Sequence, residues 1–213
     1  EGRVRMRRLA DGRDVEVPAQ QVAQVTLDTS EGIEPRERLQ PVSERRMDFE
    51  HKPRGFWTGT WRAPEPGQPG RLAAEPYVAR RKTDGGLTIR HGVRATLESD
   101  LQGAPLIIST NSMLTFRWRT ARTAAVLVMV GCAHPEDRRF GGNYQYQFRL
   151  PSTPPDAAGW RVTRCPLADF NANVQNDLGT SFLLVSRIVV SASFAADGLE
   201  VAELKLEARE RTE

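Results

Sequence analysis

The chain has 213 residues, of which 39% are apolar, with 30 Lys and Arg against 27 Asp and Glu and a formal net charge of +3. This length and composition provide for one sizeable core and an accessory piece, and they argue against a disordered chain. A charge this small, without a basic stripe or a recognition-helix pattern, argues against nucleic-acid binding. The longest apolar run spans residues 124–130, which is too short to cross a membrane.

The first 46 residues form an appendage, because every Phe, Trp and Tyr lies after them. Residues 4–9 and 15–17 alternate apolar and polar side chains around a turn at 10–13 that contains Gly12, which predicts a β-hairpin. A third β-prone run covers residues 22–27. The mixed polar stretch 29–46 is typical of a linker.

From residue 47 the pattern changes to short β-rich segments separated by Gly, Pro, Asn and Asp. Such spacing predicts an all-β domain with two sheets packed face to face. The clearest strands are expected at 114–120, 124–130, 144–150, 160–164, 187–193 and 199–207, and weaker ones at 56–62, 77–81, 87–89, 94–97 and 106–109.

The alternation within two strands assigns their faces. Leu114, Phe116 and Trp118 should point into the core, as should the apolar set of residues 144–150. The segment 126–130 is apolar at every position. We therefore expect a central strand there, covered on both faces or covered on one and lying under a shallow cleft on the other.

Three local patterns resemble the jelly-roll carbohydrate-binding modules of the galactose-binding-like type. The first is Met47-Asp48-Phe49-Glu50 followed by Trp57 and Trp61, the second joins segments 144–150 and 160–170 through a proline-rich turn, and the third is the closing pair 187–191 and 198–204. The resemblance covers about residues 47–210. It implies a two-sheet antiparallel jelly-roll β-sandwich, a fold that serves sugar binding, protein contacts and structural roles.

Residues 2–25 resemble the closing hairpin of a FecR-type domain, the extracytoplasmic β domain of bacterial regulators that control a sigma factor. Gln20 stands where that family usually has Gly. The chain also starts at Glu1 rather than Met, so we expect further sequence upstream. The predicted organisation is a FecR-like hairpin at 1–28, a linker at 29–46 and a jelly roll at 47–210. We expect these parts to belong to an extracytoplasmic envelope protein. The full-length protein is expected to be membrane-anchored, although this part makes no membrane contact.

Sugar binding needs apolar surface for the C–H faces of a pyranose and polar groups for its hydroxyls. The leading candidate surface is formed by the outward polar side chains of the strands expected at 114–120 and 144–150, provided that both strands lie in one sheet. The alternative is an ordinary solvated sheet face. This set comprises Arg117, Arg119, Gln145, Gln147 and Arg149.

The second candidate is the loop 133–143, which displays His134, Asp137 and Phe140 between two strands, although Phe140 could instead pack beneath the loop. Trp57 and Trp61 are further candidates, with core or edge packing as the alternative. Trp118 and Trp160 are expected in the core because each continues an apolar set.

Jelly rolls of this resemblance often carry a structural calcium ion between their first and last strands. Asp48 or Glu50 with Glu203 or Glu207 are the candidate ligands, and exposed carboxylates on edge strands are the alternative. Cys132 and Cys165 are expected to be two buried thiols, because a strand lying between theirs in one sheet would hold them too far apart to bridge.

No spacing of carboxylates or histidines singles out a catalytic pair, so we expect a protein that is not an enzyme. The function that the sequence favours is carbohydrate recognition by a bacterial envelope protein. The alternative is a protein-contact or sensor domain of a FecR-like transmembrane regulator.

Overall fold

The structure, a computed structural model, describes residues 2–19, 21–23, 29–30, 32–37, 42–53, 57–80, 85–96, 105–122, 125–134, 140–148, 154–172 and 183–208. The chain divides into two compact units, Glu1–Gln40 and Pro41–Glu213. Within the described ranges the regular elements are strands and two short 3-10 helices. No helix there is long and apolar enough to cross a membrane.

The first unit is built around a hairpin of β1 (Val4–Arg7) and β2 (Asp14–Val17), which pair antiparallel as the alternation predicted. Gly12 in the turn has a φ of 71°, a conformation that glycine adopts without strain. Arg8 is buried beside the turn and donates to Asp11 at 2.6 Å, and this hydrogen bond is the main reason that the pKa of Asp11 falls to about 2. A second antiparallel pair joins β3 (Gln21–Val22) to β4 (Arg36–Glu37).

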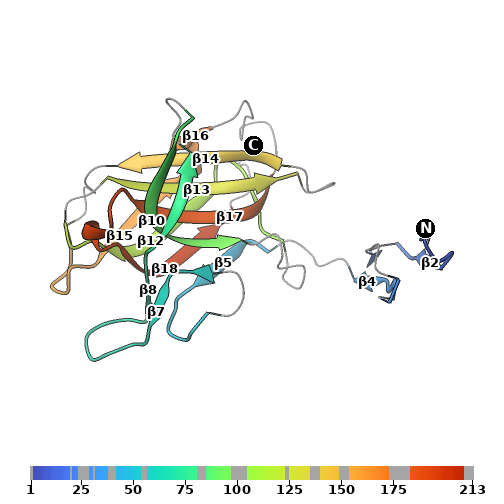
Figure 1. Ribbon diagram of the computed structural model, residues 1–213, viewed down its shortest axis with the longest axis horizontal. Coiled ribbons are helices and arrows are strands. Elements are labelled where there is room, and N and C mark those ends of the chain that lie inside the picture. The colour runs from blue at the N-terminus through green and yellow to red at the C-terminus, as the bar shows by residue number, and fades with distance from the viewer. Residues whose placement is uncertain are drawn as a thin grey trace. The chain divides into compact units, whose positions relative to one another are not determined.

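The second unit is a sandwich of two antiparallel sheets (Figure 1). We name the sheets after their central strands. The β13 sheet has eight strands in the order β16 (Asn171–Ala172), β14 (Phe140–Phe148), β13 (Val126–Ala133), β17 (Leu183–Ala192), β10 (Leu87–Thr96) and β6 (Trp57–Thr58), with β9 (Glu75–Arg80) on β10 and β11 (Ile107–Ile108) on β17. The β12 sheet has six strands in the order β15 (Arg161–Pro166), β12 (Met113–Arg119), β18 (Glu200–Glu207), β8 (Arg71–Ala73) and β7 (Thr60–Arg62), with β5 (Glu44–Met47) on β18.

The core lies between the two sheets and is made by the inward side chains of each strand. Phe116 and Trp118 of β12 are at most 1% exposed, and Val128 and Tyr144 of the β13 sheet are buried in the same cluster. Burying each such side chain contributes about 1.5–3 kcal/mol. The predicted all-β sandwich and the predicted inward set of residues 114–118 are therefore confirmed.

Long-range pairing changes several expected boundaries. The segments 87–89 and 94–97 were expected as two strands, but β10 runs through His91 and Gly92 because β9 pairs with its first half and β17 with its second. Strand β5 begins at Glu44, within the stretch 29–46 that was expected to be a linker. Strands β8 and β16 were not expected, because each is too short to show an alternation of apolar and polar residues.

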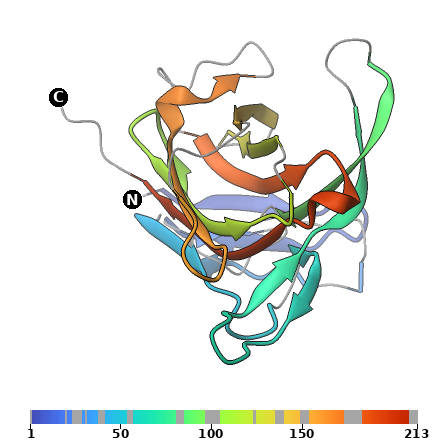
Figure 2. The same ribbon diagram turned by 90° about the vertical axis from the view of Figure 1, so that its left-hand side faces the viewer.

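The β9–β10 hairpin leaves the general direction of its sheet. In Figure 1 it runs steeply across the nearly horizontal strands β13, β14 and β17, and in the perpendicular view it stands to one side of them (Figure 2). The hairpin therefore lies at the β10 side of the sheet, beyond β17.

Gly70 is required by a close backbone contact. A Cβ at this position would lie 2.1 Å from the carbonyl oxygen of Phe49, which also accepts a hydrogen bond from the Trp61 indole at 3.0 Å. We expect Gly70→Ala to lower the free energy of unfolding by about 3 kcal/mol or more, because the backbone must move. Gly67→Ala is the control: Gly67 has a φ of 74° but open space around it, so its loss should be about 1 kcal/mol. Equal losses in urea titrations would contradict the steric explanation.

Cys132 and Cys165 are both free and buried, as expected, but they lie on β13 and β15 in different sheets. Burial raises the pKa of each thiol to about 12. We expect neither thiol to react with iodoacetamide at pH 8 in the folded protein and both to react in denaturant, as measured by mass spectrometry. Rapid labelling of the native protein would show that the sandwich opens.

Candidate functional site

The structure separates the residues of the leading candidate surface. Arg117 and Arg119 lie on β12, whereas Gln145 and Gln147 lie on β14 in the opposite sheet. The single outward surface expected from these two strands is therefore wrong, because β12 pairs with β15 and β18 while β14 pairs with β13 and β16. Arg149 and Asp137 lie outside the described residues.

The outward face of the β12 sheet is occupied by its own ion pairs. Arg119 donates to Glu200 at 2.5 Å and lies 4.6 Å from the ring centroid of Trp160. Arg117 pairs with Asp156 at 3.2 Å and lies over the same ring. A hydrogen bond from the backbone N–H of Trp160 is the main cause that lowers the pKa of Asp156.

Trp160 is 2% exposed and thus buried as expected, but arginines cover its ring on the outward side of β12. The same face holds a pocket of about 390 Å³ lined by Met113, Thr115, Arg164, Lys205 and Glu207. Lys205 in this pocket already bonds Glu44 at 2.9 Å and Glu207 at 3.2 Å, and the first of these bonds is the main reason that the pKa of Lys205 is raised. The charges of this face are therefore largely satisfied within the chain.

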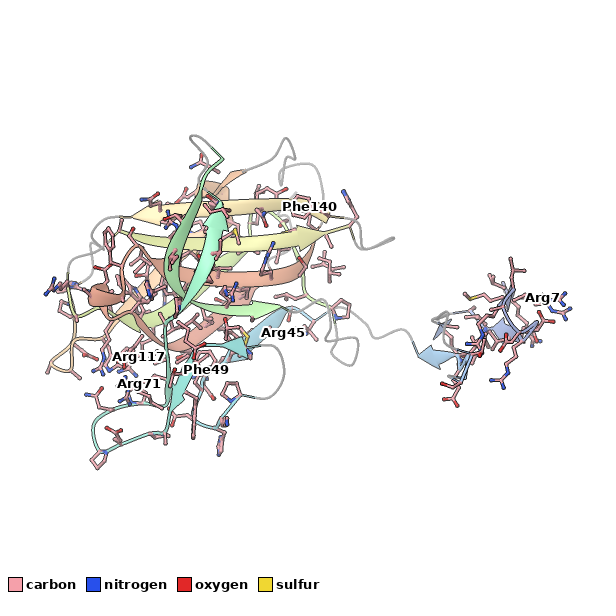
Figure 3. All side chains as sticks on the ribbon, viewed as in Figure 1. Arg7, Arg45, Phe49, Arg71, Arg117 and Phe140 are labelled. Atoms are coloured by element: carbon pink, nitrogen blue, oxygen red, sulfur yellow. The ribbon has the colours of Figure 1, made fainter. Side chains whose placement is uncertain are left out.

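The other candidate aromatics do not form a common surface. Trp57 and Trp61 are half-buried and pack against the core, Trp57 edge-on to Phe49 with ring centroids 4.9 Å apart. Phe140 is 54% exposed at the start of β14, and His134 is half-buried just after β13. Arg117 and Phe140 lie well apart on the sandwich (Figure 3).

The candidate calcium ligands are engaged locally. Asp48 accepts the backbone N–H of Glu50 at 3.2 Å, and Glu203 accepts Arg46 at 2.7 Å. Among the described residues no three His, Cys, Asp or Glu side chains gather in a way that could hold a metal ion. The structural calcium ion therefore stays a prediction of the family resemblance.

The outward face of the β13 sheet, which we call the β13 face, combines apolar and polar side chains. The strand registers place its residues in two rows across the sheet. One row is Gln145, Met129, Val189, Arg94 and Thr58; the other is Gln147, Leu127, Ser191, Gly92 and Glu75. Leu127 and Met129 are half-buried, which matches the expectation of a central strand covered fully on one face only.

At two glycines on this face, neighbouring side chains approach the backbone closely. At Gly131 a Cβ would lie 3.1 Å from Asn143 Oδ1 and 3.4 Å from Arg187 Nε, so these two side chains converge over the glycine. Asn143 Oδ1 is buried and has no hydrogen-bond partner in the described part of the chain, and Arg187 is exposed. An unsatisfied buried acceptor costs about 1–3 kcal/mol, which a ligand hydroxyl or amide could recover.

At Gly92 the missing side chain admits the ring of Tyr77, whose Cε1 would lie 2.9 Å from a Cβ. The guanidinium of Arg94 lies 4.6 Å from the centroid of the same ring, and its Nε donates to Thr58 at 3.2 Å. Tyr77 is therefore held against the sheet by contacts on two sides.

The alternation in the sequence placed Gln145 and Gln147 on an outward face, but it gave no indication that Tyr77, Arg94, Asn143 and Arg187 lie on the same face. Gly92 and Gly131 were the available signals, because a glycine inside a strand often marks the close approach of another group.

No family model matches the sequence, and no curated protein matches it. Among solved structures, the chain is similar to the family 11 carbohydrate-binding module of a cellulosomal cellulase of Clostridium thermocellum, with 14% identity, a TM-score of 0.41, and 82% of this chain and 100% of that chain covered. A complex of the family 11 module from the same organism with a mixed-linked β-1,3-1,4 tetrasaccharide gives 15% identity, a TM-score of 0.40 and coverage of 81% and 100%. A module from Cellvibrio mixtus lichenase 5A in complex with cellotriose gives 10% identity, a TM-score of 0.31 and coverage of 66% and 90%. The FecR resemblance of residues 2–25 stays a prediction.

The contact between Gly92 and Tyr77 can be tested by a double-mutant cycle. We expect Gly92→Ala to lower the free energy of unfolding by about 1–3 kcal/mol, because its Cβ displaces the Tyr77 ring. Tyr77→Ala should then cost less in the Gly92→Ala background than in the wild type, as measured by urea titration. Strictly additive losses would show that the two residues are not coupled.

Proposed function

We propose that unit 41–213 is a non-catalytic module that binds carbohydrate on the β13 face. The observation that carries the proposal is the convergence of the unpartnered Asn143 Oδ1 and the exposed Arg187 over Gly131. Beside them lie the half-buried side chains of Leu127 and Met129. Amide and guanidinium groups can orient sugar hydroxyls, and the aliphatic surface can contact C–H groups of the ring.

Binding is favoured over hydrolysis because the described strand residues of this face include a single carboxylate. Glycosidases use two carboxyl groups that flank the scissile bond. Among the described strand residues of the β13 face the one carboxylate is Glu75, which accepts a hydrogen bond from Thr60 at 2.8 Å. We further propose that the module belongs to an extracytoplasmic envelope protein, as the FecR-like hairpin suggests.

A second candidate function is protein contact within a FecR-like regulator. The side of the β9–β10 hairpin opposite Tyr77 is apolar: Val78, Leu87 and Ile89 are 65%, 69% and 62% exposed. Exposed apolar patches often mark protein contacts.

The test is affinity gel electrophoresis of the whole chain in soluble neutral and acidic polysaccharides, followed by isothermal titration calorimetry. We expect Asn143→Ala and Arg187→Ala each to weaken binding about tenfold, which corresponds to about 1.4 kcal/mol. Arg164→Ala, an exposed arginine on β15 in the β12 sheet, is the matched control and should bind normally. Absence of retardation in every polysaccharide would refute carbohydrate binding and favour the protein-contact function.

A further inference from the structure

Positive charges outnumber negative charges among the described strand residues of the β13 face. Its described strand residues carry three cations, Arg90, Arg94 and Arg187, and the single carboxylate of Glu75. None of these arginines has an ion-pair partner within the described ranges. Several cations elsewhere are paired: Arg5 with Asp14 and Arg8 with Asp11 in the first unit, and Arg46 with Glu203, Arg117 with Asp156 and Arg119 with Glu200 in the second.

We infer that the ligand of the β13 face is a polyanionic glycan that carries carboxylate or sulfate groups. This inference rests on the proposed carbohydrate function and specifies its substrate class. Unpaired guanidinium groups on a sheet surface bind carboxylates and sulfates through charge-assisted hydrogen bonds. A neutral glycan would leave these positive charges without counter-charge.

The spacing of the arginines favours a chain of charges over one small anion. Arg90 and Arg94 are four residues apart on β10, which places their Cα atoms about 13 Å from each other. Arg187 lies two residues from Val189, the cross-strand partner of Arg94, so it is a diagonal neighbour of Arg94 in the next strand. One carboxylate cannot reach all three, whereas successive charged units of a polysaccharide can.

The remaining side chains of the face favour a saccharide over a nucleic acid. Bases bind single-stranded sites by stacking on aromatic rings. Of the described outward aromatic side chains of this sheet, Tyr77 already has Arg94 against its ring, and Phe140, the cross-strand partner of Ala133, is the one left exposed. The described residues therefore offer one open ring rather than a row of stacking rings. The amides of Asn143, Gln145 and Gln147 instead offer donors and acceptors suited to hydroxyl groups.

The experiment compares the whole chain on matched pairs of polysaccharides: polygalacturonate with its methyl ester, and dextran sulfate with dextran. We expect one charged member to bind at least tenfold more tightly than its neutral counterpart, and added sodium chloride to weaken that binding. Tighter binding of polygalacturonate than of its methyl ester would identify carboxylates as the recognised groups. Tighter binding of dextran sulfate than of dextran would identify sulfates.

Charge-neutralising variants locate the effect on the protein. Arg187→Gln and Arg90→Gln should each weaken binding to the charged glycan about three- to tenfold, whereas Arg164→Gln, which removes the same charge from the opposite sheet, should not. Equal sensitivity to Arg164→Gln would show a response to net charge and overturn the inference.

Other outcomes separate this inference from the function on which it rests. Binding of the neutral members as tightly as the charged ones would overturn the polyanion but leave the carbohydrate function standing. If no polysaccharide binds, both the polyanion inference and the proposed carbohydrate function are overturned. Binding of single-stranded DNA with the same affinity and the same sensitivity to Arg187→Gln would show a general polyanion surface and overturn recognition of a glycan.

Discussion

The burial of alternate side chains between two facing sheets is the constraint on which the rest of the domain depends. Leu114, Phe116 and Trp118 of β12 and Val126, Val128 and Val130 of β13 are almost fully buried in one cluster. Since successive residues of a strand point to opposite sides, each buried position forces its neighbours outward. The composition of the two outward faces therefore follows from the registers that the core requires.

The two outward faces use their polar groups differently. On the β12 sheet, Glu200 and Asp156 neutralise arginines, and the guanidinium groups of Arg117 and Arg119 both lie over the ring of Trp160. On the β13 sheet, Asn143 Oδ1 and Ser191 Oγ have no hydrogen-bond partner among the described residues. Two further such atoms, Arg71 Nε and His91 Nδ1, lie away from this face. Buried polar atoms are usually satisfied in folded proteins, so the two on the β13 face are consistent with the binding surface proposed there.

Glycines inside strands shape that surface. Gly92 allows Tyr77 to lie against β10, and Gly131 allows Asn143 and Arg187 to converge above β13. Glycine weakens a strand because it contributes no side chain to packing and loses more entropy on folding. Both strands nevertheless have partners on each side, and these ladders hold the glycines in place.

Local sequence determined the all-β class, the first hairpin and the inward set of β12, because alternation along a single strand depends only on neighbouring residues. It also placed Gln145 and Gln147 on an outward face. Only the tertiary structure decided that Arg117 and Arg119 belong to the other sheet and that Tyr77, Arg94 and Arg187 complete the β13 face. The period of two tells which residues of one strand share a side, but strand partners are chosen by contacts between distant segments, such as β12 with β18 and β10 with β17.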